Sequence, residues 1–213
     1  MSAILHVCCS HNNNQLKLAL AQSRYKQNIH SDLKGDTVIR SYQGKTPKIH
    51  PTAWISEAAY VVGDVEIGEY SSVWPGSVIR GDTIKITLGN YVDIQDNCVL
   101  HADSDATYED YVSLGHGVIS HAKHIKTNCL IGNGATLNDG VVLGEYSIIA
   151  SGAVVLENKE FPPKSFVVGI PAVAREQETT EDHHQRIRRT AENYARKAQL
   201  FKEDGLGGTE ITK

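Results

Sequence analysis

The sequence predicts a mainly β protein: a parallel β-helix of six-residue repeats followed by one C-terminal α-helix. Aliphatic residues recur every six positions through the middle of the chain, and a small or β-branched residue usually follows each one four positions later. Near the C-terminus the spacing of apolar residues changes to three and four. We therefore divide the chain into an N-terminal appendage (1–37), a β-helix domain (38–175), and a C-terminal amphipathic helix with its tail (176–213).

The six-residue ladder has three sections. Its rungs are Ile49, Ile55, Val61, Ile67, Val73 and Ile79, then Leu88, Ile94 and Leu100, then Ile125, Ile131, Leu137, Leu143, Ile149 and Val155. In a regular strand the first, third and fifth residues would all point to the same side. Here the first and fifth point inward and the third points outward, which implies a corner in each repeat. Three short strands with their corners make a triangular coil, and successive coils stack about 4.8 Å apart like neighbouring parallel strands. A β-sandwich would instead show turn residues about every 8–12 positions.

The ladder is interrupted twice. The step from Ile79 to Leu88 is nine residues, and no aliphatic rung is found between Leu100 and Leu114. Residues 101–113 include the polar stretch Asp103–Thr107, so we expect them to bulge from one corner as a loop. Because loops on a rigid scaffold often carry function, we expect the functional site beside this interruption.

The two ends of the chain differ from the repeats. Residues 1–37 lack the six-residue period, and we hypothesise that native translation starts at Val38. Residues 180–203 are expected to form an amphipathic helix, with Thr179 and Asp182 as its capping box and with His183 and His184 solvated in its first turn. One such helix alone is marginally stable, so it should dock along the β-helix or on a neighbouring subunit. Its apolar face contains Ile187, Ala191, Tyr194, Ala198 and Phe201.

Composition excludes several classes of partner. The formal net charge is −4 with no long run of Lys or Arg, which argues against nucleic-acid binding. No apolar stretch approaches the roughly 18 residues that span a bilayer. The N-terminus shows no basic region followed by an apolar run, so we do not expect a secretory signal. Cys98 and Cys129 fit as small buried residues of a reducing compartment, so we expect a cytoplasmic protein.

Three histidines beside the interruption are the candidate metal ligands. His101 follows the rung Leu100, and His121 follows the rung position held by Ser120, so both should point outward, one coil apart. His116 also points outward. Three imidazoles with an open fourth position are typical of a catalytic zinc site, and a second subunit could supply the third imidazole.

Polar residues precede the histidines in the same coils. Arg80 and Asp82 lie in one coil, and Gln95 and Asp96 lie in the next. An Arg–Asp ion pair on the surface usually contributes little to the free energy of unfolding. At an interface, however, such a pair could fix subunit register, and Gln95 could orient solvent on a metal. His124 is either an exposed bystander or a proton relay.

At these residues the sequence resembles the γ-class carbonic anhydrase family and its carbonic-anhydrase-like relatives, from Ile39 to about Arg175. The shared motifs are Arg80-Gly81-Asp82, Ile94-Gln95-Asp96-Asn97, Leu100-His101, Gly115-His116 with His121 five residues on, and Gly169-Ile170-Pro171-Ala172.

The resemblance implies a left-handed β-helix and a homotrimer with metals at the subunit interfaces. It places His101 and His121 on one subunit and His116 on its neighbour. It also implies that Arg80, Asp82 and Asp96 form interface ion pairs, and that Gln95 hydrogen-bonds near the solvent on the metal.

The implied activity is the reversible hydration of CO2 to bicarbonate with Zn²⁺, Fe²⁺ or Co²⁺. The sequence departs from the family at Thr83, where the best-studied members have an acidic residue, and at Asp93, where Asn is common. The acidic loop is reduced to Asp103–Glu109, whose two end residues are proton-transfer candidates. A hexapeptide acyltransferase, a non-catalytic metal-binding scaffold subunit and a thioesterase-type relative remain alternatives.

Overall fold

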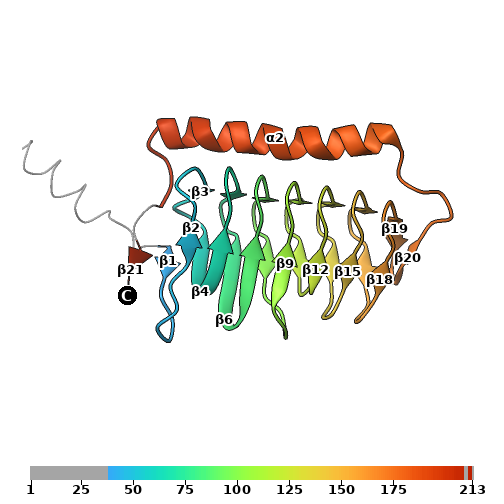
Figure 1. The fold of residues 1–213 in the computed structure, drawn as a ribbon, viewed down its shortest axis with the longest axis horizontal. Helices are drawn as coiled ribbons and strands as arrows, with labels where there is room; N and C mark the ends of the chain where they lie inside the picture. The colour runs from blue at the N-terminus through green and yellow to red at the C-terminus, as the bar shows by residue number, and fades with distance from the viewer. Residues whose placement is uncertain (1–37, 209–210, 213) are drawn as a thin grey trace, which may run out of the picture. The chain divides into compact units, whose positions relative to one another are not determined.

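A computed structural model describes residues 38–208 and 211–212. These residues form a parallel β-helix of about seven coils with one helix beside it, which confirms the predicted fold class (Figure 1). The proposed appendage, residues 1–37, lies outside the described residues.

The coils have three faces, each a stack of short parallel strands. The first face contains β1 (Ile39–Arg40), the start of β4 (Tyr60–Ile67), the start of β6 (Val78–Leu88), β8 (Val99–Leu100), β11 (Ile119–Ser120), β14 (Thr136–Leu137) and β17 (Val154–Val155). The second contains β2 (Lys48–Ile49), the ends of β4 and β6, β9 (Ala106–Tyr108), β12 (His124–Ile125), β15 (Val142–Leu143) and β18 (Glu160–Phe161). The third contains β3 (Trp54–Ile55), β5 (Ser72–Val73), β7 (Asp93–Ile94), β10 (Ser113–Leu114), β13 (Leu130–Ile131), β16 (Ile148–Ile149), β19 (Phe166–Gly169) and the antiparallel β20 (Ala172–Ala174). Strand β21 (Ile211–Thr212) pairs with β1 and adds one more strand to the first face.

The predicted ladder forms the core. Every rung from Ile55 to Val155 is at most 3% exposed, and Ile49 packs half-buried at the open end of the first coil. Small polar residues four positions beyond a rung can form hydrogen bonds inside the coil. Ser77 Oγ, for example, donates to the carbonyl of Gln95 at 2.6 Å. Cys98 and Cys129 are buried free thiols, as predicted.

The expected loop between Leu100 and Leu114 is shorter than predicted. Only residues 101–105 are irregular, because Ala106–Tyr108 forms strand β9 and pairs with β6 and β12. Tyr108 is the rung that a search for aliphatic residues overlooked. It is 1% exposed, and its hydroxyl donates to Ser120 Oγ at 2.7 Å. The small Ser120, two rungs further along the chain, makes room for the ring and accepts its hydrogen bond.

The C-terminal helix α2 (Glu181–Glu203) docks on the third face of its own chain, over β3, β5, β7 and β10 (Figure 1). Ile187, Ala191 and Ala198 are buried as expected, and Ala195 joins them. Phe201 remains 37% exposed. No helix among the described residues is long and apolar enough to cross a membrane.

Aromatic side chains fix the C-terminal half of the helix to the coils. The rings of Trp54 and Trp74, on the third face, lie 4.8 Å apart between centroids. Phe201 meets both edge-on at 5.3 and 5.2 Å, and Tyr194 meets Trp74 in the same way. Such pairs contribute about 0.5–1.5 kcal/mol each beyond the area they bury.

The start of the helix differs from the expectation. The N-cap is Thr180, whose side chain and backbone form a reciprocal capping box with His183. Thr179 instead donates from Oγ1 to the carbonyl of Tyr146 at 2.7 Å and contacts Nε2 of His184 at 2.9 Å. The prediction of a solvated side chain was therefore wrong for His184, which is 13% exposed, whereas His183 is half-buried in the capping box.

Tyr108→Phe should lower the free energy of unfolding by about 1 kcal/mol, because Ser120 Oγ loses a buried partner. Ser120→Ala should also destabilise, by leaving the tyrosine hydroxyl unpaired. Urea unfolding of both single variants and the double variant gives the coupling between them. We expect the double variant to lose less stability than the two single losses added together; simple additivity would contradict this pairing.

Candidate metal centre

His101 and His121 lie together at the corner between the first and second faces. His101 follows β8 and His121 follows β11, and these strands pair with Leu100 opposite Ser120. The two imidazoles therefore stack in adjacent coils, with ring centroids 5.3 Å apart and planes at 75°. Their side chains are 14% and 32% exposed. The expected neighbouring, outward-facing pair is present.

His116 occupies a different corner, between the third and first faces, because it follows β10. Its side chain is 50% exposed, and its Nδ1 contacts Asp96 Oδ2 at 2.9 Å. The structure thus brings Asp96 to His116 but does not bring His116 to the other two histidines of the same chain. The strand β11 of the first face separates the two corners.

Among the residues that the structure describes, one group of three ligand-type side chains lies close enough to share a cation. It consists of Asp103, His121 and Asp139, with their ligand atoms within 4.8 Å of one another. Asp103 comes from the irregular residues 101–105, whereas Asp139 comes from the turn after β14. Asp139 was missed in the sequence because its carboxylate has no position in the histidine motifs, although its Asn138-Asp139-Gly140 turn follows the same ladder one coil beyond His121.

Each of the three histidines has its own carboxylate partner. His101 Nε2 lies 3.2 Å from Asp82 Oδ1, and His121 Nδ1 lies 3.0 Å from Asp139 Oδ1. His116 has Asp96, as described above. An imidazole that donates one N–H to a carboxylate presents the lone pair of its other nitrogen to a metal, so these residues fit a divalent metal. Three imidazoles suit zinc, iron or cobalt.

Asp82 connects Arg80 to His101. Its Oδ2 accepts from the guanidinium of Arg80, and its Oδ1 accepts from the backbone N–H of Thr83 at 2.9 Å. Partial burial by itself would raise the pKa of Asp82, but the hydrogen bonds from Arg80 and His101 outweigh it and hold that pKa below its usual value. The carboxylate therefore stays ionised beside His101 at neutral pH.

Gln95 follows β7 on the side of the coil that carries His116. It is 5% exposed, and its Nε2 donates to Asp93 Oδ1 at 2.8 Å. Asp93 is itself 1% exposed, between the third face and the helix, and also accepts from Ser113 Oγ at 2.5 Å. Burial raises the pKa of Asp93 to about 7, against the lowering effect of these two hydrogen bonds.

The two proton-transfer candidates separate in space. Asp103 lies beside His121, as described above. Glu109 instead contacts His124, with Oε1 and Nε2 at 2.7 Å, and also accepts from the backbone N–H of Thr127 at 3.0 Å. Glu109 and His124 therefore form a local pair at the second face, apart from the two stacked histidines.

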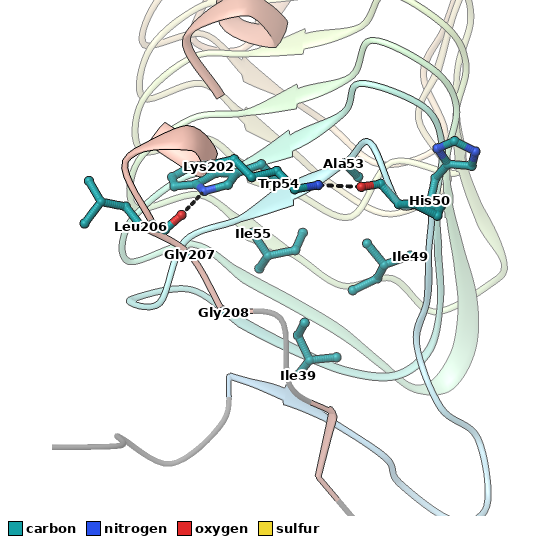
Figure 2. A pocket seen from close by; sticks show the side chains of 12 residues that line it. Ile39, Ile49, His50, Ala53, Trp54, Ile55, Lys202, Leu206, Gly207 and Gly208 are labelled. Atoms are coloured by element: carbon teal, nitrogen blue, oxygen red, sulfur yellow. Dashed lines mark hydrogen bonds between the residues drawn. The ribbon is translucent and has the colours of Figure 1, made fainter. Parts of the chain in front are cut away.

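A cavity of about 400 Å³ lies elsewhere, at the open end of the first coil. Figure 2 shows Ile39, Ile49 and Ile55 around it, with Trp54 beside Leu206. The indole N–H of Trp54 donates to the carbonyl of Leu206 at 2.7 Å, which ties the C-terminal segment over this end. None of the three candidate histidines lines this cavity.

Comparisons with known proteins identify the family. Residues 46–81 and 123–157 match the family model described as bacterial transferase hexapeptide (six repeats). The chain is 39% identical over 168 residues to a carbonic anhydrase of Geobacillus kaustophilus, covering 78% of this chain and 91% of that protein. It is 45% identical over 145 residues to a probable carbonic anhydrase of Methanocaldococcus jannaschii, covering 67% and 90%.

A solved structure from Bacillus cereus, described as a putative acetyltransferase, is also similar. It has a TM-score of 0.75 and 37% identity, covering 78% of this chain and 96% of that one. The fold is thus that of hexapeptide-repeat proteins. Within them, the chain belongs to the γ-class carbonic anhydrase and carbonic-anhydrase-like family.

Asp93→Asn should change how stability depends on pH. Between its ordinary pKa of 3.8 and about 7, Asp93 holds a proton in the folded state that the unfolded chain has released. Wild-type stability should therefore fall as pH rises through this window, by about 1.4 kcal/mol per unit of raised pKa. The neutral amide removes this loss. The free energy of unfolding of the variant, measured with urea, should therefore rise relative to that of wild type between pH 4 and pH 8. Parallel curves for the two proteins would contradict the assignment.

Proposed function

We propose that this protein catalyses the reversible hydration of CO2 to bicarbonate at a metal centre shared between the subunits of a homotrimer. His101 and His121 of one subunit and His116 of the next would hold the metal. The observation that carries the proposal is the stacked pair at one corner and the third imidazole at another, each with one nitrogen already bonded to a carboxylate. Relatives named as carbonic anhydrases support the reaction.

The outer surface of the first face supports the shared site. Its outward residues form one row in register: Tyr60, Val78, Val99, Ile119, Thr136 and Val154. Tyr60 is 40%, Val99 37% and Ile119 46% exposed. An exposed apolar patch of this kind is typical of a protein interface.

The other two faces are less suited to this contact. Helix α2 covers the third face, and the second carries the ion pairs that Glu66 makes with Lys48 and Lys85. A repeated contact through the first face would set the His116 corner of one chain against the His101–His121 corner of the next. Such a head-to-tail contact closes into a ring when the rotation permits.

The chain's own residues prepare the site for this chemistry. A divalent metal on three neutral imidazoles lowers the pKa of coordinated water towards neutrality, and zinc is the metal we propose, with iron or cobalt as substitutes. Asp82 orients the imidazole of His101, and Asp96 orients that of His116. Gln95, held through Nε2 by Asp93, keeps its Oε1 as an acceptor for solvent. Exposed Asp103 beside His121 is positioned to pass a proton to solvent.

Acyl transfer is the alternative suggested by the name of the similar Bacillus cereus structure. Acyltransferases of this fold generally use one catalytic histidine with a coenzyme A groove, so three histidines each held by a carboxylate favour the metal. Acetyl-CoA binding without metal would reverse this preference. Metal binding without hydration activity would favour the scaffold or thioesterase-type alternative.

His116→Ala should remove most of the metal and the hydration activity. Loss of a ligand should lower metal affinity by more than the roughly 10–100-fold typical of an outer-shell partner. Metal per chain and CO2 hydration are measured on protein purified without oxygen. His124→Ala is the matched control, because His124 bonds to Glu109, and it should keep both properties. A metal-free wild type would refute the site.

Ile119→Asp should dissociate the trimer and, with it, release metal, although Ile119 offers no metal ligand. A carboxylate in the centre of the apolar row opposes burial at an interface. Val142→Asp, an outward strand position on the second face, is the control. Sedimentation and metal analysis at the same protein concentration test the two effects together. A dissociated variant that kept its full metal content would show that each chain binds metal alone.

A further inference from the structure

Asp139 is a carboxylate that no family motif quoted above contains. It lies in the turn after β14, one coil beyond His121, and its Oδ1 is 3.0 Å from His121 Nδ1. We propose that Asp139 is the positioning residue of His121. It holds the Nδ1 proton and so turns Nε2 towards the metal. This inference rests on the proposed function, because it assigns a role at the same site.

Backbone geometry holds both partners rigidly. The N–H of His121 donates to the carbonyl of Leu137 at 2.8 Å, which ties the histidine to the strand that leads into the turn. The carbonyl of Asp139 accepts from the N–H of Asn158 in the next coil, also at 2.8 Å. Gly140 completes the turn with φ +73°, and a Cβ there would lie 2.3 Å from the Asn158 side chain. Asp139 therefore cannot drift from His121 without breaking the stack of coils.

The carboxylate of Asp139 has fewer hydrogen-bond partners than the carboxylate of Asp82. Asp82 shares its negative charge between Arg80, the Thr83 N–H and His101. Among the described residues, the carboxylate of Asp139 has His121 as its one hydrogen-bond partner. An unshared carboxylate raises the basicity of the imidazole it contacts and strengthens that imidazole as a ligand. His121 should therefore depend more on its carboxylate than His101 does.

Asp103 provides a matched comparison. It belongs to the same group of three side chains, so its negative charge lies close to His121. It is exposed and comes from the irregular residues 101–105, whereas the carboxylate that accepts a hydrogen bond from His121 is that of Asp139. If proximity of charge alone mattered, Asp103 and Asp139 would contribute equally. If the hydrogen bond to the imidazole matters, Asp139 should contribute more than Asp103 to metal binding by His121.

The test loads the purified full-length protein with Co²⁺ and measures apparent affinity by competition with a chelator, together with the visible absorption spectrum. Asp139→Ala should weaken Co²⁺ binding about 10–100-fold. Asp139→Asn should recover part of this loss, because its amide oxygen can accept the same Nδ1 proton. Asp103→Asn should weaken Co²⁺ binding much less than Asp139→Ala does, and all variants should keep the wild-type spectrum. Thermal unfolding confirms that each variant is folded.

Several outcomes would overturn the proposal. If wild type and Asp139→Ala bound Co²⁺ with equal affinity, Asp139 would have no positioning role. Equal weakening by Asp103→Asn would assign the effect to charge alone. A changed spectrum in Asp139→Ala would make Asp139 a direct ligand. A wild type that binds no Co²⁺ would defeat the proposed function and this inference together, whereas a wild type that binds Co²⁺ without hydrating CO2 defeats the function only.

Discussion

Hydrogen bonding between successive coils sets the height and direction of every outward side chain in this protein. Each strand in the interior of the stack pairs in parallel with the strands one coil before and one coil after it, while the buried rungs keep the register from slipping. A shift of one residue would turn the rungs outward and expose the core. The same constraint that buries Leu100 therefore places His101 outward, directly beside His121. The candidate metal centre is thus a consequence of the register.

The three faces of the coil have different surroundings, and this difference organises the molecule. The third face is covered by α2 through the cluster of Trp54, Trp74 and Phe201. That cover buries Asp93, which in turn holds Gln95. The first face has no cover from the described residues of its own chain and presents an apolar row between the two histidine corners. One face thus supports the site from behind, while another offers a surface for a neighbouring subunit.

Carboxylates connect these elements to the chemistry. Asp82, Asp96 and Asp139 each contact one of the three candidate histidines, although they come from different coils. None of these pairs would add much stability as a partly exposed ion pair. Their consequence is directional, because a carboxylate favours the tautomer that carries its proton on the nearer imidazole nitrogen. The irregular residues 101–105 widen the corner at this point and bring Asp103 beside His121.

The sequence by itself determined the repeat, the buried rungs, the C-terminal helix and the outward, neighbouring placement of His101 and His121, because a strict period of six constrains both the inward and the outward positions. Only the tertiary structure decided the rest. Tyr108 became a rung because Ser120, in the next coil, leaves room and accepts its hydroxyl. Asp139 became the partner of His121 across 18 residues of sequence, and Asp93 became buried because the helix lies over it. These contacts join different coils and elements, so a local pattern along the chain cannot contain them.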